Sequence, residues 1–339
     1  MLKLGVLDQS HINEGHNATN ALSNTLQLAQ AADELGYSRF WMSEHHASPS
    51  LAHSSPEIMI AHVASQTKRI RVGSGGIMLP HYSAYKVAEN FRLLEALYPN
   101  RIDLGVGRAP GGMPLATRAL QEGKFPSMHS SDRYPQQIVD LIGYLNDATP
   151  SDHRFAGLIA EPSISTNPEL WLLGSSGGTA ELAAMTGASY AFAQFFGTAG
   201  GEEAVAHYKE NFQPSVMASA PKSLAAITVS CADTEEEAEY HMRSNDLYFL
   251  MLRENRPMPY LPSAKTAAEY PYTRTEKSHI EDTRRFRVVG TPDQVREKLL
   301  RFAADYQTDE LLIVSAIHDN EARIRSYRLL AEAFQLGQN

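Results

Sequence analysis

The sequence predicts a single α/β domain with the (β/α)8 TIM-barrel architecture, and three observations support this fold class. Short runs of β-branched and aromatic residues alternate with amphipathic stretches, which is the pattern of βαβ units around a parallel sheet. Eight such runs occur along the 339 residues, and a hydrophobic fraction of 43% is enough for a large core. In such a barrel the functional residues lie at the carboxyl ends of the strands.

The predicted strands form a regular series. They are LKLGVLD at 2–8, RFWMSE at 39–44, RIRVGSGGIML at 69–79, RIDLGVG at 101–107, LWLLG at 170–174, SYAFAQF at 189–195, LAAITVS at 224–230 and ELLIVSA at 310–316. Between them, apolar residues recur at intervals of three and four in helical stretches such as 21–36, 85–99 and 204–212. Gly36 and Pro99 provide stop signals for the first two of these helices.

Two long segments interrupt this alternation. Residues 109–131, which follow the fourth strand, are rich in Gly and Pro, and residues 253–285 form a second long connection. Structureless connections of this length are typical of lids, binding loops or disordered insertions. The barrel pattern resumes after the second segment, so we predict one domain over 1–339, with both segments inserted as active-site loops or lids at the carboxyl-end face.

Charge and cysteine content limit the function classes. A net charge of -9 argues against nucleic acid or an anionic membrane surface as the main partner. The first residues, MLKLGVLDQSH, lack the apolar core of a signal peptide, and no segment has the unbroken apolar length of a membrane span. We therefore expect a cytoplasmic protein that acts on a small molecule. Cys231 is the only cysteine, which excludes an internal disulfide and a thiolate metal cluster within one chain.

The run FWMSEHH, residues 40–46, ends a buried-looking strand in a carboxylate and two imidazoles. Burial of an unpaired charge is costly, so Glu44, His45 and His46 indicate that the strand opens there into a polar site. A metal site is one alternative, since His53 and His62 follow nearby. Adjacent strand residues point to opposite faces, however, so we predict no metal. A second alternative is that these histidines only cap the barrel rim.

Small residues mark two further strand ends. Gly75 and Gly76, within GSGGIMLP, indicate either a bulge or a close approach to the backbone. Arg108 follows the fourth strand and could make a bidentate contact to phosphate, although an exposed ion pair is the alternative. A helix begins after the fifth strand, where backbone amides and hydroxyls could bind the same anion or simply cap the helix. The residues of this turn are Ser175, Ser176, Gly177, Gly178 and Thr179.

Together, FWMSEHH, the stretch from 69 to 111 and VVGTPDQVREKLLRFA at 288–303 resemble the bacterial-luciferase-like, flavin-dependent oxidoreductases. The resemblance runs from the first strand to the last helix, and it is closest to a bacterial group of FMN-dependent members with unassigned substrates. It implies that Gly75-Gly76 is a non-proline cis peptide against the flavin ring. It also implies that Arg108 and residues 175–179 hold the FMN phosphate, and that His45 performs acid-base chemistry.

The same resemblance implies a substrate pocket beside the flavin. Its expected residues are Asp8 at the end of the first strand, Glu44 and His46 beside the acid-base histidine, and His81 and Tyr82 after IMLP. The light-emitting α chain has a cysteine next to its phosphate arginine, whereas this chain has Gly107. Light emission from a long-chain aldehyde is therefore not expected.

The expected function is an FMN-dependent, two-component monooxygenase that uses O2 on a small organic substrate. Reduced FMN would come from a separate flavin reductase, because no Gly-x-Gly-x-x-Gly turn follows a strand. A deazaflavin-dependent hydride-transfer enzyme and a non-catalytic flavin-binding protein are the alternatives. The family often forms dimers, and the apolar helix at 85–99 is suited to a homodimer interface.

Overall fold

We describe the protein from a computed structural model that covers residues 2–108, 112, 114–123 and 133–337. The strands are β1 (Lys3–Asp8), β2 (Arg39–Met42), β3 (Arg71–Met78), β4 (Ile102–Gly107), β5 (Glu169–Gly174), β6 (Ser189–Ala193), β7 (Ser223–Cys231), β8 (Arg287–Gly290) and β9 (Glu310–Val314). The α-helices are α1 (Ala18–Leu35), α2 (Pro56–Ser65), α3 (Ala84–Leu97), α4 (Pro114–Leu120), α5 (Tyr134–Leu145), α6 (Gly177–Thr186), α7 (Gly201–Glu210), α8 (Glu235–Arg253), α9 (Ala264–Glu269), α10 (Arg274–Arg284), α11 (Pro292–Asp305) and α12 (Asn320–Phe334). Two short 3-10 turns, η1 (Leu79–His81) and η3 (Gln194–Phe196), follow β3 and β6.

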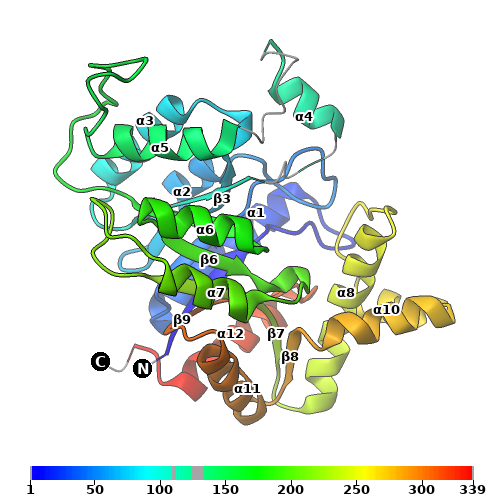
Figure 1. Ribbon diagram of the computed structural model, residues 1–339. Coiled ribbons are helices and arrows are strands. Elements are labelled where there is room, and N and C mark those ends of the chain that lie inside the picture. The colour runs from blue at the N-terminus through cyan, green and yellow to red at the C-terminus, as the bar shows by residue number, and fades with distance from the viewer. Residues whose placement is uncertain (1, 109–111, 113, 124–132, 338–339) are drawn as a thin grey trace.

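Eight of the strands close into a parallel barrel, which confirms the predicted fold class. Each strand from β1 to β7 pairs with the next one along the chain, and β9 pairs with both β7 and β1 to complete the circle. The helices surround this sheet (Figure 1). Most of the buried apolar side chains lie between the outer face of the barrel and these helices.

The predicted helices at 21–36, 85–99 and 204–212 correspond to α1, α3 and α7. Gly36 ends α1 in the left-handed conformation, with φ of 86°, and donates its N–H to carbonyls of the last helical turn. A side chain at this position would be strained, because residues other than glycine rarely adopt a positive φ. The stop signal read from the sequence is therefore confirmed at Gly36.

The ninth strand, β8, was missed by the sequence analysis. It lies outside the closed barrel and pairs only with the C-terminal half of β7, while the N-terminal half of β7 pairs with β9. Its four residues, Arg287–Gly290, are too short to show the alternation that marks a strand. The long strand β7 therefore pairs along one edge with two strands in succession, first with β9 and then with β8.

The sequence suggested a structureless connection over 253–285, and the structure corrects this expectation. The segment contains α9 and α10, each of which begins at a side-chain N-cap, Ser263 for α9 and Thr273 for α10. These caps are sequence signals that the analysis missed. The segment contacts the loop after β1, where Ser263 donates its backbone N–H to Glu14. Its role as a lid stays a prediction.

The other predicted loop, 109–131, is described only in part. Residues 114–123 contain the short helix α4, and residue 112 forms an isolated parallel bridge with His46. The remaining residues of this predicted loop lie outside the described part of the chain. The described portion therefore lies next to the end of β2, where the site described below is found.

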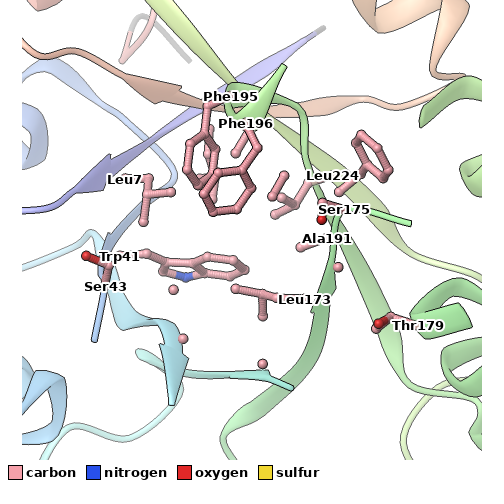
Figure 2. Close-up of a pocket in the computed structure, with 18 of the residues that line it drawn as sticks. Leu7, Trp41, Ser43, Leu173, Ser175, Thr179, Ala191, Phe195, Phe196 and Leu224 are labelled. Carbon is pink, nitrogen blue, oxygen red and sulfur yellow. The ribbon is translucent and has the colours of Figure 1, made fainter. Parts of the chain in front are cut away.

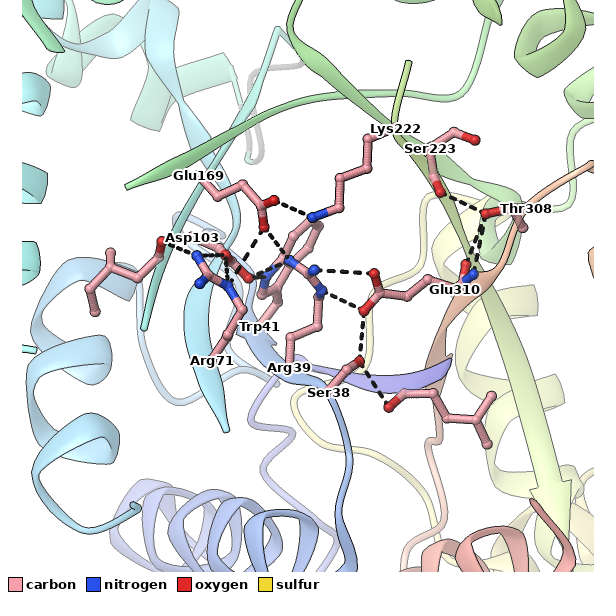
Figure 3. A network of polar contacts seen from close by, with 12 residues as sticks. Ser38, Arg39, Trp41, Arg71, Asp103, Glu169, Lys222, Ser223, Thr308 and Glu310 are labelled. Atoms are coloured by element: carbon pink, nitrogen blue, oxygen red, sulfur yellow. Dashed lines mark hydrogen bonds and ion pairs between the residues drawn. The ribbon is translucent and has the colours of Figure 1, made fainter. Parts of the chain in front are cut away.

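A buried ionic cluster fills the amino-terminal end of the barrel (Figure 3). Arg39 lies at its centre, with its Nη1 2.6 Å from Asp103 Oδ2 and its Nε 2.7 Å from Glu310 Oε1. The remaining members are Arg71, which pairs with Asp103, and Glu169, which pairs with Lys222. Burial alone would lower the pKa of Arg39, but the neighbouring carboxylates raise it above its usual range. Arg39 is therefore charged at any ordinary pH.

Two tryptophans lie directly on this ionic cluster. The guanidinium of Arg39 is 4.8 Å from the ring centroid of Trp171, and the indole N–H of Trp41 donates to Asp103 over 2.8 Å. The two indoles contact each other edge to face. Because Arg39 and Trp41 are two residues apart on β2, they point to the same face of the strand, one above the other. The ionic cluster therefore fixes the positions of the two indoles, which form a layer between the cluster and the carboxyl-end half of the barrel.

Among the helices of the described residues, none is long and apolar enough to cross a membrane.

Candidate active site

A cavity of about 510 Å³ opens above the tryptophan layer, at the carboxyl ends of the barrel strands. This volume lies in the range of small-molecule and cofactor sites, roughly 300–1,000 Å³. Its described lining comes from all eight barrel strands and the turns after them. The lining residues are Leu7, Gln9, Trp41, Ser43, His45, Gly75, Gly76, Met78, Gly107, Arg108, Leu173, Gly174, Ser175, Ser176, Thr179, Ala191, Phe192, Ala193, Phe195, Phe196, Leu224, Ala226 and Leu312.

The walls of the cavity are largely apolar and aromatic. In Figure 2 the rings of Phe195 and Phe196 lie on the opposite side of the cavity from the indole of Trp41, with Leu7 and Leu173 near the indole. The two phenylalanine centroids are 4.3 Å apart. Flat aromatic ligands gain stability from such surfaces, both by burial and by ring stacking. The shape therefore suits a planar aromatic ring system.

Gly75 and Gly76 expose bare backbone to this cavity. Their peptide bond is cis, as the resemblance implied. A Cβ on Gly75 would lie 2.7 Å from Leu7 Cδ1, and one on Gly76 would lie 2.6 Å from the carbonyl oxygen of Gly105. The pairing of β3 with β4 also shifts register between Ser74 and Ile77. Both interpretations of these glycines are therefore confirmed: the strand has an irregularity at this point, and neighbouring atoms lie too close to leave room for a side chain.

Arg108 and the turn before α6 both line this cavity. Arg108 follows β4 and is exposed to the cavity, and no other described residue forms an ion pair with it. Helix α6 begins at Gly177, directly after Ser176, whose side chain makes no capping hydrogen bond. The free amides of a helix N-terminus and a nearby guanidinium both favour negative charge. Of the residues predicted to hold phosphate, Arg108, Ser175, Ser176 and Thr179 line this one cavity, and their binding of an anion stays a prediction.

The turn between β5 and α6 is shaped by its small residues. Ser175, Ser176 and Thr179 line the cavity, whereas Gly177 and Gly178 are not among its described lining residues. A Cβ on either of these two glycines would meet nothing within 4 Å, so they leave the first turn of α6 uncovered. A Cβ on Gly174, in contrast, would lie 2.7 Å from Thr179. The absence of side chains thus keeps the helix amides accessible.

His45 is the ionisable side chain of the FWMSEHH run that reaches the cavity. Its Nδ1 lies 3.0 Å from the hydroxyl oxygen of Ser43, which fixes the orientation of the ring. Burial lowers the pKa of His45 to about 4, and the neighbouring His53 and His46 add to this effect. The imidazole is therefore neutral near pH 7 and able to accept a proton.

Glu44 lies behind the cavity rather than in its described lining, contrary to the expectation of a shared pocket. One oxygen of its carboxylate accepts the backbone N–H of Met78 over 3.0 Å. The other lies 2.8 Å from the hydroxyl of Tyr82 and 2.7 Å from Nε2 of His46. His81 contacts the His46 ring edge to face, with centroids 5.7 Å apart. These four side chains join the end of β2 to the end of β3.

Asp8, expected in the substrate pocket, is likewise absent from the described lining, which includes its neighbours Leu7 and Gln9. Asp8 is fully buried, with an oxygen 2.5 Å from Arg323 and another 2.6 Å from the Thr25 hydroxyl. Burial tends to raise its pKa, but Arg323 and the hydrogen bonds lower it to about 2. Neighbours on a strand face opposite ways, so Leu7 points into the barrel and Asp8 towards the helices.

Several lining residues were missed by the sequence analysis, including Trp41, Ser43 and the Phe195–Phe196 pair. Trp41, Ser43 and His45 alternate along the chain from β2, and all three line the cavity. The period of two was therefore the signal that could have identified the first two. The phenylalanine pair offered no such signal, because η3 turns the chain after β6.

The metal alternative receives no support from the described residues, among which no group of three or more His, Cys, Asp or Glu side chains could hold a metal ion. His46 is instead paired with Glu44.

Comparison with known proteins identifies similar chains along nearly the full length. Residues 2–308 match the luciferase-like monooxygenase family. An uncharacterized protein of Bacillus subtilis, YwcH, is 52% identical over 334 residues, which are 98% of this chain and 99% of that protein. An N-acetyl-S-alkylcysteine monooxygenase of the same organism is 38% identical over 335 residues, or 98% of each chain. The crystal structure of apo-MsnO8 is 38% identical, covers 100% of both chains and superposes with a TM-score of 0.87.

Two more distant structures share the fold. The oxygenating constituent of 3,6-diketocamphane monooxygenase from Pseudomonas putida, in complex with FMN, is 19% identical over 98% of this chain and 97% of that chain, with a TM-score of 0.71. An F420-dependent secondary alcohol dehydrogenase is 14% identical over 98% of each chain, with a TM-score of 0.67. The same barrel therefore occurs with both kinds of flavin cofactor.

Proposed function

The chain belongs to the luciferase-like monooxygenase family, and on this premise we propose that it is an FMN-dependent, two-component monooxygenase acting on a small organic substrate. One observation carries the proposal: a single cavity is lined both by apolar and aromatic side chains and by Arg108 and the turn before α6. The apolar and aromatic side chains suit an isoalloxazine ring, and Arg108 with the turn before α6 suits a phosphate. The proposal is therefore specific for a phosphorylated flavin.

The described residues fit FMN. Arg108, Ser175, Ser176 and Thr179 would hold the phosphate through charge and hydrogen bonds. Trp41 and the leucines near it would contact the ring system, and the side-chain-free backbone of Gly75-Gly76 would allow it to approach closely. When bound in reduced form, FMN would supply the electrons with which one atom of O2 is transferred to the substrate.

His45 is the residue that we assign to proton transfer at this site. It is neutral near pH 7, is oriented by Ser43 and lines the cavity. A bound anion would raise the pKa of His45 towards neutrality, because an opposite charge favours the protonated form. The aromatic walls would exclude water from the cavity. Glu44, which bonds to Met78, Tyr82 and His46, would hold His45 in place because these contacts join the end of β2 to the end of β3.

Reduced FMN would be supplied by a separate flavin reductase, since no nicotinamide-binding turn is evident in the sequence. The similarity to an N-acetyl-S-alkylcysteine monooxygenase supports a small organic substrate. We test the function by following oxygen uptake with a generic flavin reductase across candidate substrates. Oxygen uptake that never depends on the protein would contradict a monooxygenase.

FMN is expected to bind more tightly than riboflavin, and Arg108→Ala is expected to remove most of this preference. A hydrogen bond to a charged group contributes about 1.5–3 kcal/mol, so the FMN affinity should fall about 10- to 150-fold while that of riboflavin changes little. Fluorescence titration under anaerobic conditions measures both constants. Arg301→Ala, an exposed arginine on α11, is the matched control.

Equal affinities for FMN and riboflavin in the wild type would show that the phosphate site lies elsewhere. The same titration with the deazaflavin cofactor distinguishes the hydride-transfer alternative. Tighter binding of the deazaflavin than of FMN, without oxygen consumption, would replace the monooxygenase by a dehydrogenase or reductase.

We further propose that two copies associate through α2 and α3. Ile58 on α2, and Leu93 and Leu97 on α3, are 68%, 52% and 57% exposed. Neighbouring exposed apolar side chains on two adjacent helices are typical of an interface between subunits. Sedimentation at micromolar concentration is expected to give a dimer for the wild type and a monomer for Leu93→Glu. A monomeric wild type would exclude this assembly.

A further inference from the structure

A second cavity adjoins the reaction cavity and shares a wall with it. Its volume is about 530 Å³, which also lies in the range of small-molecule sites, roughly 300–1,000 Å³. Phe195 and Phe196 line both cavities, so this pair forms the common wall. We call the second one the outer cavity. Its remaining walls come from α8, α10 and the start of β8, and none of these elements contributes to the described lining of the reaction cavity.

Two packed helices each present one face to the outer cavity. Four of its lining residues on α8 recur at intervals of three and four, which places them on one side of the helix. They are Asp246, Phe249, Leu250 and Arg253. On α10, His279 and Thr283 lie one turn apart. Figure 1 shows α8 and α10 together beside β7 and β8, and Arg284 of α10 donates to Asp246 of α8 over 2.9 Å. The outer cavity is therefore formed by helices that are held against each other.

One positive charge in this lining has no partner. Asp246 is paired with Arg287 and Arg284. Arg284 is also paired with Glu239, so these four charges cancel. Arg253, the last residue of α8, forms no ion pair or hydrogen bond through its side chain among the described residues. The chain as a whole carries a net charge of -9, so an unpaired guanidinium beside a cavity is a local exception. It favours an anionic group in the outer cavity.

His279 adds a second polar group to the same cavity. Its ring nitrogen Nδ1 is shielded from solvent and has no hydrogen-bond partner among the described residues. Its Nε2 has no such partner either, but this atom is not shielded, which leaves it available to a ligand. An imidazole N–H donates a hydrogen bond to a carboxylate, as a guanidinium does. Two side-chain donors without partners therefore line one cavity.

The rest of the outer cavity is largely apolar and aromatic. Phe196 is 56% exposed and Leu252 is 41% exposed. Phe249 and Phe286 add two further aromatic rings to the lining. Apolar side chains that border a cavity gain stability when an apolar molecule covers them, and aromatic rings gain more from a ring that packs against them. A ligand with an apolar body and one anionic end matches both parts of the lining.

We propose that the outer cavity binds a small organic acid, with its carboxylate on Arg253 and His279 and its apolar body against the phenylalanine rings. A carboxylate fits better than a phosphate, because a singly charged group matches a single unpaired cation. In addition, Arg253 lies at the C-terminal end of α8, where the helix dipole disfavours a second negative charge. The site goes beyond the proposed function, since none of these contacts involves the flavin.

The binding test uses the cofactor-free protein and isothermal titration calorimetry with phenylacetate and octanoate, each compared with its neutral amide. The wild type is expected to bind each acid about 10- to 150-fold more tightly than its amide, which corresponds to one hydrogen bond to a charged group. Arg253→Gln is expected to remove this difference. His279→Phe, which keeps an aromatic ring, is expected to reduce it to a smaller extent. Because Arg253 is exposed, its replacement should leave folding unchanged.

Two arginine variants are the controls. Arg274→Gln removes another exposed arginine of the same segment, on α10, and Arg108→Ala removes the arginine of the reaction cavity. Both should keep the wild-type affinity for the acids. A loss in Arg108→Ala but not in Arg253→Gln would place the acid in the reaction cavity and overturn the proposal.

Three results with the wild type would also overturn it. Equal binding of acid and amide, or no detectable binding of either acid, would show that the carboxylate is not recognised. Acetate that binds as tightly as phenylacetate would show that the apolar walls play no part. Tighter binding of inorganic phosphate than of either acid would show that the cavity takes another class of anion.

A separate experiment identifies the source of the acid. The wild type is incubated with the acid, O2 and FMN that a flavin reductase keeps reduced, and the acid is then analysed by mass spectrometry. A product heavier by one oxygen atom shows that the acid is the substrate, whereas an acid recovered unchanged is an effector. A protein that fails to bind FMN would contradict the proposed function but not the outer site, which the cofactor-free titration decides.

Discussion

Replacement of His45 by alanine is expected to lower turnover by about two to four orders of magnitude, the contribution of one positioned acid-base group, while FMN binding stays nearly unchanged. The binding contacts come from other residues, chiefly Arg108, the turn before α6 and the aromatic walls. His45 contributes one edge of the cavity, held by its hydrogen bond to Ser43. The loss should therefore appear in the rate and in the product formed per reduced FMN.

The pH profile separates this role from a structural one. The pKa of His45 lies below its usual value in the cofactor-free protein, so protonation removes the proton acceptor only on the acid side of neutrality. The wild type should therefore lose activity as the pH falls through the pKa of His45, and the variant should lack this acid limb. His62→Ala, at an exposed histidine on α2, should behave like the wild type.

We propose to measure three quantities in the wild type, His45→Ala and His62→Ala: the flavin affinity, the metal content and the amount of product formed per reduced FMN. Unchanged coupling in His45→Ala would end the acid-base assignment and favour a histidine that only caps the barrel rim. Activity that is abolished by a chelator, together with stoichiometric metal in the purified protein, would replace the flavin-only interpretation of this site.

Replacement of Arg39 by methionine is expected to lower the free energy of unfolding by about 3–5 kcal/mol. Methionine keeps much of the volume but removes the charge, so Asp103 and Glu310 lose their closest partner in a site without solvent. Glu310 would then keep no ion-pair partner among the described residues, and Asp103 would keep only Arg71. The penalty comes from the loss of the central positive charge beside buried carboxylates rather than from lost packing.

Urea unfolding measures this loss, and two further variants identify its cause. Arg301→Met, on the exposed face of α11, should change the free energy of unfolding by less than about 0.5 kcal/mol. Arg39→Met combined with Asp103→Asn and Glu310→Gln should recover part of the loss, because neutral groups cost less to bury. A loss below about 1 kcal/mol in the single variant would show that the cluster is hydrated and does not depend on Arg39.

The consequences of Arg39→Met should reach the cavity. Trp41 is anchored through Asp103, to which it donates its indole N–H, and Arg39 lies over the ring of Trp171. Movement of Asp103 would therefore loosen the floor of the cavity and weaken FMN binding in any protein that remains folded. The ionic cluster thus links the stability of the barrel to the shape of the site.

The sequence by itself determined the barrel and which strand ends line its cavity. Strands and helices are specified by local periodicity, and the carboxyl ends of parallel barrel strands meet at one face, so residues after different strands converge. For this reason the described lining of the cavity includes the predicted residues His45, Gly75, Gly76, Arg108, Ser175, Ser176 and Thr179. The segment 253–285 was misjudged only because its capping residues were overlooked.

Only the tertiary structure decided which polar side chains face the cavity and which support it. Asp8 turns outwards to Arg323, 315 residues later in the chain, and Glu44 turns away to Met78 and Tyr82. The Arg39 cluster likewise joins β2, β4 and β9. Such partners depend on the order and stagger of the strands in the closed barrel. No local pattern encodes this register, because each strand satisfies its own periodicity whichever distant residue it meets.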